Sequence, residues 1–395
     1  MKYFVLIMDG AAGLPLAEQG NRTSLEIART PNLDALSAAG MVGLSHNVPA
    51  GLEPDSAVAC MSIFGYDPAV YYAGRAPIEA VSLDIPINPG EVIFRCNLVT
   101  VQDGKMVSHS AGSISTEESR EIIKTLNEKL GNENIIFYAG VNYRNILKLK
   151  NAADTALAVC TPPHDIPGKP VAEFLPKGKG SDLLLDLMKK SELVIKDHPV
   201  NKKRLAEGKL PATGIWLFWG SGKINKMPQF RENYKADAAV TSAVGLLQGL
   251  GKMSGMSLLH INGVTDGPDN DYAGQVQGAL DALKRYDVII VHVEAPDEAG
   301  HAGSLKTKVG AIENIDKFMV SAMRKWRGQK RILVTPDHPT PVTSRTHNSD
   351  PVPFLLWGPG ITGNGAKRLT EKEAKRTGLE IAEGHTIMRK LLGDK

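Results

Sequence analysis

The sequence has few cysteines and no disulfide or thiolate-metal pattern. Its 395 residues include three cysteines, Cys60, Cys96 and Cys160, which lie far apart and form no Cys-x-x-Cys pair. An odd number of isolated cysteines argues against a disulfide framework and against a thiolate zinc site. It is typical of proteins in a reducing compartment. We therefore expect a cytoplasmic protein.

The sequence also lacks an excess of charge of one sign and lacks a long apolar run. The 46 Lys and Arg residues nearly balance the 43 Asp and Glu residues, which gives a net charge of +3. Nucleic-acid-binding domains usually carry a concentrated basic surface, and a membrane-spanning helix needs about 20 apolar residues in a row. We therefore expect neither nucleic acid nor a membrane as a partner. The oligomeric state stays open.

Apolar runs near both ends of the chain predict a doubly wound α/β fold with a mostly parallel sheet. Runs of this kind are typical of strands that are buried on both faces. They occur at residues 3–8, 257–261, 287–293, 331–335 and 352–357, and helical patterns at 272–283 and 306–325 alternate with them. The first run is too short for a signal peptide and ends at Asp9-Gly10, so we interpret it as the first strand.

The middle of the chain has a different texture, and the chain length favours two domains. Residues 91–101 alternate like a strand, and Asp103-Gly104 is a hairpin signal. Residues 116–130 form an amphipathic pattern that ends at Gly131. We predict that residues 75–210 form an inserted, smaller α+β domain. Residues 1–74 and 211–395 would together form the core.

Ser56 lies in the segment that most suggests a nucleophile, residues 51–68. Pro54 and Asp55 are turn formers, and the small apolar residues 57–64 suit a buried helix. Ser56 would then lie at or near a helix N-terminus, where free N–H groups and the helix dipole favour an anion such as phosphate. The alternative is that Ser56 is only a helix N-cap, the commonest role of a serine there.

Side chains able to bind a metal follow three of the predicted strands. They are Asp9 after the first strand, Asp297 and His301 after residues 287–293, Asp337 and His338 after residues 331–335, and His347 in a nearby loop. The carboxyl ends of parallel strands meet at one edge of a sheet, where α/β folds bind ligands. Carboxylates and imidazoles suit Mn²⁺ or Zn²⁺.

Further polar residues are candidates either for substrate contacts or for structural roles. His109 is flanked by small residues and is a candidate to meet a substrate. Lys223 follows a glycine-rich turn and is a candidate for binding phosphate, although an exposed lysine is the default interpretation. His260 and His292 lie inside strand patterns, so we interpret them as core or sheet histidines.

Several segments resemble the alkaline phosphatase superfamily, and more closely its archaeal-type 2,3-bisphosphoglycerate-independent phosphoglycerate mutases. These segments are Met8-Asp9-Gly10, residues 62–68, residues 296–301, residues 335–338 and residues 346–353. The resemblance spans nearly the whole chain and includes residues 74–80 and 140–144. The metal motifs are specific for the superfamily and less specific for the mutases.

The resemblance implies an α/β core of alkaline-phosphatase type with two divalent metal ions, of which Mn²⁺ is favoured over Co²⁺, Zn²⁺ or Mg²⁺. No 2,3-bisphosphoglycerate would be needed. The implied ligands are Asp297, His301 and His347 for one ion, and Asp9, Ser56, Asp337 and His338 for the other.

Ser56 would be the catalytic nucleophile that interconverts 3-phosphoglycerate and 2-phosphoglycerate through a phosphoserine. The inserted domain would close over this small phosphorylated metabolite. Within it, Arg95, Arg144 and His109 are the candidates for binding phosphate and carboxylate, because arginine forks match both groups.

Three other functions remain open at this point. Another phosphoryl transferase of the superfamily, such as a homoserine kinase, would keep the two-metal serine and change only the inserted domain. A plain phosphatase or phosphodiesterase is less consistent with the large insert. A non-enzymatic binding protein would be expected to lack several of the seven metal-binding residues, and the sequence retains all seven.

Overall fold

The computed structural model describes residues 1–223 and 225–393 and divides into two compact units. The first unit comprises Met1–Tyr72 and Asn225–Lys395, and the second comprises Ala73–Ile224. The last two residues of the predicted core, 394 and 395, lie outside the described part. Among the described residues, every helix is too short or too polar to span a bilayer.

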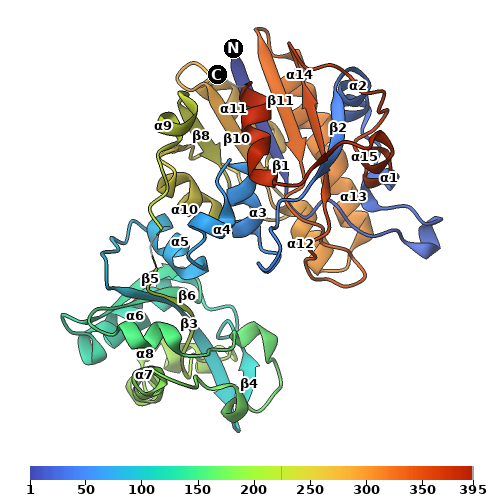
Figure 1. Cartoon of the computed structure of the whole chain (residues 1–395). Helices are drawn as coiled ribbons and strands as arrows, with labels where there is room; N and C mark the ends of the chain where they lie inside the picture. Colours follow the sequence, from blue (N-terminus) through green and yellow to red (C-terminus); the bar gives the residue numbers. More distant parts are fainter. Residues whose placement is uncertain (224, 394–395) are drawn as a thin grey trace. The chain divides into compact units, whose positions relative to one another are not determined.

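The first unit is built on an eight-stranded sheet with the order β13-β2-β12-β11-β1-β10-β8-β9 (Figure 1). Within it, β12 runs antiparallel to both of its neighbours, and the other pairs are parallel. This confirms the predicted α/β fold with a mostly parallel sheet. The strands are β1 (Lys2–Met8), β2 (Met41–Ser45), β8 (Ala238–Thr241), β9 (Ser257–Leu258), β10 (Val288–Val293), β11 (Lys330–Thr335), β12 (Val352–Trp357) and β13 (Glu380–Ile381).

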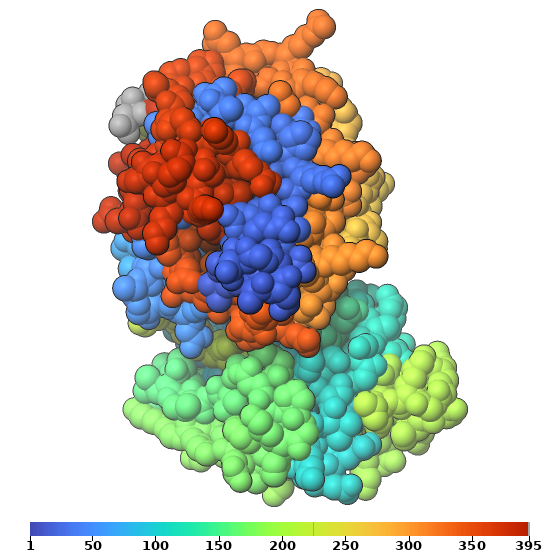
Figure 2. Space-filling view, turned by 90° about the vertical axis from the view of Figure 1, so that its right-hand side faces the viewer, coloured from blue at the N-terminus to red at the C-terminus, as the bar shows by residue number. Residues whose placement is uncertain are grey.

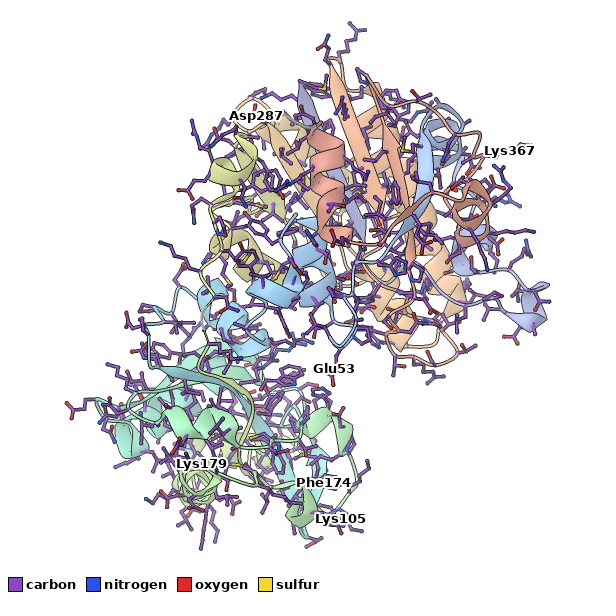
Figure 3. All side chains as sticks on the ribbon, in the orientation of Figure 1. Glu53, Lys105, Phe174, Lys179, Asp287 and Lys367 are labelled. Atoms are coloured by element: carbon purple, nitrogen blue, oxygen red, sulfur yellow. The ribbon has the colours of Figure 1, made fainter. Side chains whose placement is uncertain are left out.

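Strand β1 is central because its side chains are apolar on both faces. Phe4, Leu6 and Met8 are fully buried in the core on one face. β1 pairs in parallel with β10 and β11, so the carboxyl ends of these three strands are level with one another. Side chains that follow the three strands therefore meet at one edge. At the other end of the sheet, Lys2 pairs with Asp287, which is labelled in Figure 3.

Helices cover both faces of this sheet. α2, α11, α13 and the π-helix that follows share the apolar core of Phe4, Leu6 and Met8, while α3, α10 and α16 lie on the other face (Figure 1). The helices are α1 (Ser24–Ile27), α2 (Pro31–Ala39), α3 (Ser56–Ile63), α4 (Pro68–Tyr71), α9 (Phe230–Tyr234), α10 (Gly245–Met253), α11 (Tyr272–Ala282), α12 (Ala295–His301), α13 (Leu305–Asn314), the π-helix (Ile315–Val320), α14 (Ser321–Lys325), α15 (Glu371–Thr377) and α16 (Ile387–Leu392).

Segments from the two ends of the chain lie side by side on one face of this unit, blue and red in Figure 2. β13 pairs with β2. The buried carboxylate of Glu371 accepts hydrogen bonds from the Gly13 N–H and the Thr23 hydroxyl. The loop that follows β1 is therefore held by a helix from the end of the chain.

The second unit is an antiparallel sheet with helices packed on both faces. Its elements are α5 (Arg75–Ser82), β3 (Val92–Gln102), β4 (Lys105–Ser108), α6 (Thr116–Leu130), β5 (Ile135–Val141), β6 (Arg144–Leu149), α7 (Ser181–Ile195), α8 (Pro199–Ala206) and β7 (Gly214–Ser221). Phe94, Cys96 and Leu98 of β3 share a core with α6 and α7. Ile93 faces the opposite way and packs against α5. Alternate side chains of β3 therefore point to opposite faces of the sheet. One face packs on α6 and α7, and we call the other the second face of β3.

The border between the units differs from the prediction at residue 211. The segment 211–224 was expected to belong to the core, because it resembles the core strands that run into glycine-rich turns. Instead, β7 pairs antiparallel with β3, with Trp216 opposite Asn97. The apolar pattern of a strand shows that it is buried but does not show which strand it will pair with.

Two further segments, one helical and one extended, differ from what their sequence patterns indicate. Residues 181–206 have a continuous helical pattern but form two helices, α7 and α8, divided at Pro199, because proline has no N–H to continue the helical ladder and favours a first-turn position. The predicted strand at 257–261 is shorter, since β9 ends at Leu258, and His260 is exposed. The interpretation of His260 as a core histidine was therefore wrong.

Arg204 provides a test of how the second unit is held together. It is 2% exposed, its Nη1 donates to Glu118, and its Nε and Nη2 donate to the carbonyls of Leu210, Ala111 and Gly112. We expect Arg204→Leu to lower the free energy of unfolding by about 3–5 kcal/mol, because the substitution removes the cation from the part-buried Glu118 carboxylate and leaves several carbonyls without their donor. Urea denaturation followed by circular dichroism measures the change.

The matched control is Arg120→Leu, which alters an exposed arginine on α6. It should change the same free energy by less than about 0.5 kcal/mol. Equal losses in the two variants would show that the buried network of Arg204 has no special weight.

Candidate active site

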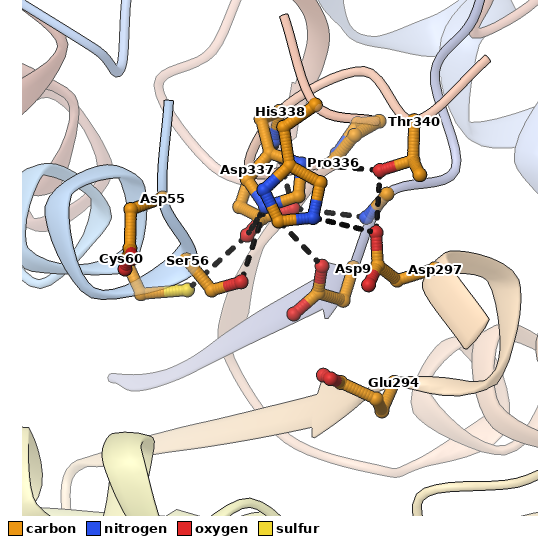
Figure 4. A network of polar contacts seen from close by, with 12 residues as sticks. Asp9, Asp55, Ser56, Cys60, Glu294, Asp297, Pro336, Asp337, His338 and Thr340 are labelled. Carbon is orange, nitrogen blue, oxygen red and sulfur yellow. Dashed lines mark hydrogen bonds and ion pairs between the residues drawn. The ribbon is translucent and has the colours of Figure 1, made fainter. Parts of the chain in front are cut away.

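The residues predicted to bind metal come together at the carboxyl ends of β1, β10 and β11 (Figure 4). Asp9 follows β1, Asp297 lies in α12 directly after β10, and Asp337 follows β11. Gly10 makes this close approach possible. It has a φ of +58°, and a Cβ at this position would lie 2.7 Å from the Cα of Asp297, so a larger residue would push the two loops apart.

His338 is the centre of a first group of ligand atoms. Its Nε2 lies 3.1 Å from Ser56 Oγ, 3.2 Å from Asp337 Oδ2 and 3.7 Å from Asp9 Oδ1. Asp337 Oδ1 accepts the Gly10 and His338 N–H groups, which leaves Oδ2 directed at the site. Asp9 Oδ1 is buried and has no hydrogen-bond partner in the structure. A buried carboxylate oxygen without a partner is costly, so this group fits a bound cation.

Ser56 is not the N-cap of its helix. Asp55 occupies that position, and its carboxylate accepts the Ala57 N–H at 2.7 Å. Ser56 is the first residue of α3, and its hydroxyl faces His338. The alternative that Ser56 serves only as a cap is therefore wrong, because a stronger capping side chain precedes it and leaves the hydroxyl available.

Asp297, His301 and His347 form a second group. Asp297 Oδ2 is 3.1 Å from His301 Nε2, and Asp297 Oδ1 is 3.4 Å from His347 Nε2. The two Nε2 atoms are 2.9 Å apart. Each ring has its Nδ1 near a backbone carbonyl, that of Arg345 for His301 and that of Pro54 for His347. If each Nδ1 donates to its carbonyl, both Nε2 lone pairs face the Asp297 carboxylate, which is how imidazoles present themselves to a metal ion.

Thr340 sets the orientation of His338 in the same way. Its hydroxyl donates to Asp297 Oδ1, so its oxygen can accept from His338 Nδ1 at 3.3 Å. This arrangement leaves the Nε2 lone pair of His338 directed at Asp9, Asp337 and Ser56. With a metal ion bound, the three histidines of the site would share one tautomer, with the proton on Nδ1 and the lone pair on Nε2.

Titration of the site reflects burial and crowded charge. Burial, followed by repulsion from Asp337 and Asp297, raises the pKa of Asp9 well above its usual range. Burial would also raise the pKa of Asp297, but hydrogen bonds from His301 and His347 hold it well below its usual value. The Asp297 contact raises the pKa of His301 to about 9. Without a metal ion, the site therefore retains protons that an ion would displace.

The ligand atoms form overlapping groups. Asp9, Asp337 and His338 make one group, and Asp297, His338 and His347 make another, with all ligand atoms of a group within 4.8 Å of one another. His338 belongs to both, so the two groups are contiguous. The group of Asp297, His338 and His347 contains His338 where the resemblance implies His301. The Nε2 atom of His301 nevertheless lies beside Asp297 and His347.

The sequence reasoning missed three residues beside this site, of which His292 and Lys308 are buried. His292 and Glu294 form a further group with Asp9. Lys308 lies behind the site, where Nζ donates to the carbonyls of Ala12 and Thr340, and burial lowers its pKa to about 8. His292 is buried and hydrogen-bonded, as expected of a sheet histidine, but its partner is Asp9. The sequence signal that could have revealed His292 and Glu294 is their spacing. They lie two residues apart at the end of the strand that leads to Asp297, so their side chains point to the same face.

A separate cluster of cationic and aromatic side chains lies on the second face of β3. Arg95 is buried, donates to Glu79 and Asn97, and lies 5.9 Å from the Trp219 ring centroid. Arg75 stacks over Trp219 at 4.5 Å. The remaining members are His109, Tyr143, Arg144 and His164.

The electrostatics of this cluster favour an anion. Burial, and then the charge of Arg144, lower the pKa of His109. Burial lowers the pKa of His164, and nearby cationic groups add to the effect although Asp165 opposes it. Mutual repulsion of this kind is relieved when a negative group binds. Arg75 and His164 were not predicted, since neither has a sequence signal beyond its residue type.

The predicted substrate residues occupy different positions in this unit. His109 and Arg144 lie next to each other through Tyr143. Arg95 donates hydrogen bonds to the Glu79 carboxylate, so its role includes holding the cluster together. Lys223 is exposed in the turn after β7, where its backbone N–H donates to Ser221 Oγ.

Comparisons with known proteins agree on one family. The family model described as 2,3-bisphosphoglycerate-independent phosphoglycerate mutase matches residues 37–201. The protein of that name from Methanosarcina barkeri is 46% identical over 98% of each chain. A protein from Geobacter sulfurreducens, described as a probable enzyme of the same name, is 43% identical over 99% of this chain and 100% of its own.

Two solved structures are similar over the whole length. A Pyrococcus horikoshii protein has a TM-score of 0.84 and 27% identity, and it covers 100% of this chain and 98% of its own. A cofactor-independent phosphoglycerate mutase from Thermoplasma acidophilum has a TM-score of 0.65 and 25% identity, with 100% of both chains covered.

The raised pKa of His301 gives a testable pH dependence. A group whose pKa is higher in the folded protein stabilises it below the unfolded pKa, and this stability is lost as pH rises through the folded pKa. For His301 these values are 6.5 and about 9, and the raised pKa of Asp9 acts in the same direction. We expect the melting temperature of the chelator-treated protein to fall as the pH rises from about 6.5 to about 8.

His301→Gln should reduce this fall, because the variant lacks the titrating group. The matched control is His260→Gln, which changes an exposed histidine of the same unit and should retain the wild-type slope. Differential scanning fluorimetry across the pH interval measures all three proteins. Identical slopes for wild type and His301→Gln would contradict this account of the site.

Proposed function

The chain belongs to the 2,3-bisphosphoglycerate-independent phosphoglycerate mutase family, and we propose that Ser56 carries the phosphoryl group in its reaction. The activity is the interconversion of 3-phosphoglycerate and 2-phosphoglycerate without 2,3-bisphosphoglycerate. One observation carries the proposal for Ser56. Its hydroxyl lies at the start of α3, 3.1 Å from His338 Nε2, in a site with a buried, unpartnered Asp9 oxygen.

Divalent metal use follows from the family and from the carboxylate and imidazole groups of the site. We propose two ions, with Asp9, Ser56, Asp337 and His338 as ligands of one and Asp297, His301 and His347 as ligands of the other. The uniform Nε2 orientation and the crowded carboxylates support this assignment. We favour Mn²⁺, because mixed oxygen and imidazole ligands suit it. Bound divalent ions lower the pKa of a serine hydroxyl and offset charge on a transferring phosphoryl group.

The proposed reaction moves one phosphoryl group twice. The Ser56 oxygen loses its proton and attacks phosphorus, while the bond to the 3-oxygen of glycerate breaks and that oxygen gains a proton. Glycerate then reorients, and its 2-hydroxyl loses its proton and attacks phosphorus. The bond from phosphorus to the Ser56 oxygen breaks, and that oxygen gains a proton. Water must be excluded throughout, because hydrolysis of the phosphoserine would release phosphate.

We further propose that the cationic cluster of the second unit binds the carboxylate and phosphate of the substrate. Arg144 is the best-placed arginine of this cluster for a substrate, because Arg95 and Arg75 both lie against the Glu79 carboxylate. Arginine forks bind both groups in a bidentate manner. In this proposal the inserted unit determines the acceptor, and the site around Ser56 performs the transfer.

We also propose a cytoplasmic location for this enzyme. The three cysteines are free, and two of them are buried, which is consistent with a reducing compartment. The substrate is a small phosphorylated metabolite.

Phosphoserine formation at Ser56 is directly testable. Wild-type protein with Mn²⁺, quenched in acid during turnover of 3-phosphoglycerate, should carry phosphate on the peptide that spans residues 51–68. Ser56→Ala should lose this label and lose turnover by orders of magnitude, because it lacks the accepting oxygen. Mass spectrometry locates the phosphate, and chelator-treated wild type should stay unlabelled.

Ser62 provides the control on the same peptide. Its hydroxyl is buried and donates to the Asn47 carbonyl at 2.6 Å, so Ser62→Ala should still become phosphorylated at Ser56. Phosphate on Ser62, or near-normal activity of Ser56→Ala, would refute the assignment. Phosphorylation of homoserine from ATP, without conversion of 3-phosphoglycerate, would instead indicate a kinase of the same superfamily.

The anion cluster is tested by a pair of charge-removing variants. Arg144→Gln should raise KM for 3-phosphoglycerate at least about tenfold, because a charge-assisted pair contributes about 1.5–3 kcal/mol. Lys223→Gln removes the same charge from an exposed turn of the same unit. If Lys223→Gln raises KM as much as Arg144→Gln does, the predicted phosphate role of Lys223 is supported and the cluster is not the main determinant.

A further inference from the structure

His292 connects the Asp9 carboxylate to a chain of hydrogen bonds that leads away from the site. Its ring is 1% exposed. Nε2 lies 2.7 Å from Asp9 Oδ2, and Nδ1 lies 3.0 Å from Ser242 Oγ. The Val244 N–H donates to the same Ser242 oxygen at 3.0 Å. No role in the phosphoryl transfer described above requires His292, so its position calls for a separate explanation.

The direction of these hydrogen bonds follows from the carboxylate. An ionised Asp9, as a metal ligand would be, offers only acceptors, so His292 Nε2 carries the proton and donates to Oδ2. Nδ1 of the neutral ring then accepts from the Ser242 hydroxyl, whose oxygen accepts the Val244 N–H. This tautomer is the opposite of the one that His301, His338 and His347 would share with a metal ion bound. His292 is thus a hydrogen-bond donor to a carboxylate, whereas those three would present lone pairs.

The backbone of His292 is also fixed. Its carbonyl accepts from Gln275 Nε2 at 3.0 Å, and Asn270 Nδ2 donates to Gln275 Oε1 at 2.9 Å. β10 pairs with β1, with His292 opposite Ile7. The ring has little freedom to turn away from Asp9, because both its main chain and its far nitrogen are held.

We propose that His292 is a positioning residue that fixes the rotation of the Asp9 carboxylate, and so directs Oδ1 to the metal ion. The inference rests on the proposed role of Asp9 as a metal ligand. Oδ2 is engaged by the His292 N–H, while Oδ1 is buried, unpartnered and 3.7 Å from His338 Nε2. A carboxylate with one oxygen held needs no reorganisation when the ion binds. Hydrogen-bonded partners of ligating groups typically change metal affinity by 10–100-fold.

Glu294 suggests a competing interpretation of the same cluster. Its Oε2 is buried without a hydrogen-bond partner, 3.5 Å from His292 Nε2. Asp9, His292 and Glu294 have ligand atoms within 4.8 Å of one another, which is close enough to hold a third cation. The hydrogen-bond directions oppose this interpretation, because the Nε2 of His292 carries a proton and offers no lone pair. Counting bound ions separates the two interpretations.

Two substitutions whose side chains differ in length test the positioning role. His292→Gln places an amide N–H at about the distance of the histidine Nε2 from the backbone, whereas the amide of His292→Asn is too short to reach Asp9 Oδ2. Metal-free proteins are titrated with Mn²⁺, and bound and free ion are measured by equilibrium dialysis. Wild type should bind two ions per chain. His292→Asn should weaken one ion by 10–100-fold and leave the other within about threefold, while His292→Gln should stay near wild type.

Activity provides a second readout that a purely structural defect would not give. Because the defect lies in metal affinity, excess Mn²⁺ should restore turnover of His292→Asn, with little change in KM for 3-phosphoglycerate. Ser242→Ala, which removes the donor to Nδ1, should weaken the same ion to a smaller extent. Glu294→Gln should leave the ion count at two.

The outcomes distinguish this inference from the proposed function. Equal weakening of both ions, or equal defects in His292→Gln and His292→Asn, would show that donation to Asp9 is not the role of His292. Three ions in wild type and two in Glu294→Gln would assign the cluster as a third cation site and overturn the inference. Normal binding of two ions by His292→Asn would also overturn it and leave the two-metal proposal intact. Wild type that binds no Mn²⁺ would overturn both.

Discussion

The structure depends on the concentration of buried negative charge at one edge of a parallel sheet. Three carboxylates, those of Asp9, Asp297 and Asp337, are at most 3% exposed. They lie close together because β1, β10 and β11 end level with one another. Such a cluster is unfavourable unless protons or cations compensate it. The pKa of Asp9 rises for this reason. The sheet that stabilises the fold therefore also brings together buried negative charges that divalent cations can compensate.

The immediate surroundings of the cluster determine which atoms face the site. Backbone carbonyls lie against Nδ1 of His301 and His347, and the Thr340 hydroxyl lies against Nδ1 of His338. Each contact leaves an Nε2 lone pair directed inward. Asp337 is fixed by two backbone N–H groups. The proposed ligands therefore already face the site in this structure, and the Ser56 hydroxyl faces it as well, because Asp55 caps the helix.

The two units contribute different chemistry. The first unit gathers carboxylates, imidazoles and a serine, which suit activation of a hydroxyl and transfer of a phosphoryl group. The second unit uses the alternation of β3 to place Ile93 and Arg95 on the face opposite α6 and α7. Arg75 and Arg144 then bring positive charge beside the neighbouring aromatic and histidine rings. In the reaction proposed here, the separation lets a common transfer site be combined with an insert that selects the substrate.

The sequence alone determined the features that depend on neighbouring residues. The apolar run that became β1 predicted a strand buried on both faces, and the helix Thr116–Leu130 was predicted from its period and from Gly131. Motif resemblance identified the family and singled out seven residues that the structure brings into one cluster. These inferences succeed because hydrophobic period, turn formers and short motifs are local properties of the chain.

Tertiary structure alone decided the features that depend on partners distant in the chain. Residues 211–224 belong to the second unit because β7 pairs with β3. No local sequence pattern determines which strand β7 pairs with. His292 looked like an ordinary sheet histidine until the pairing of β10 with β1 placed it against Asp9. Many of the hydrogen bonds and the shifted pKa of Asp9 likewise arise from groups distant in the chain. They exist only once the chain has brought those groups out of water and into contact.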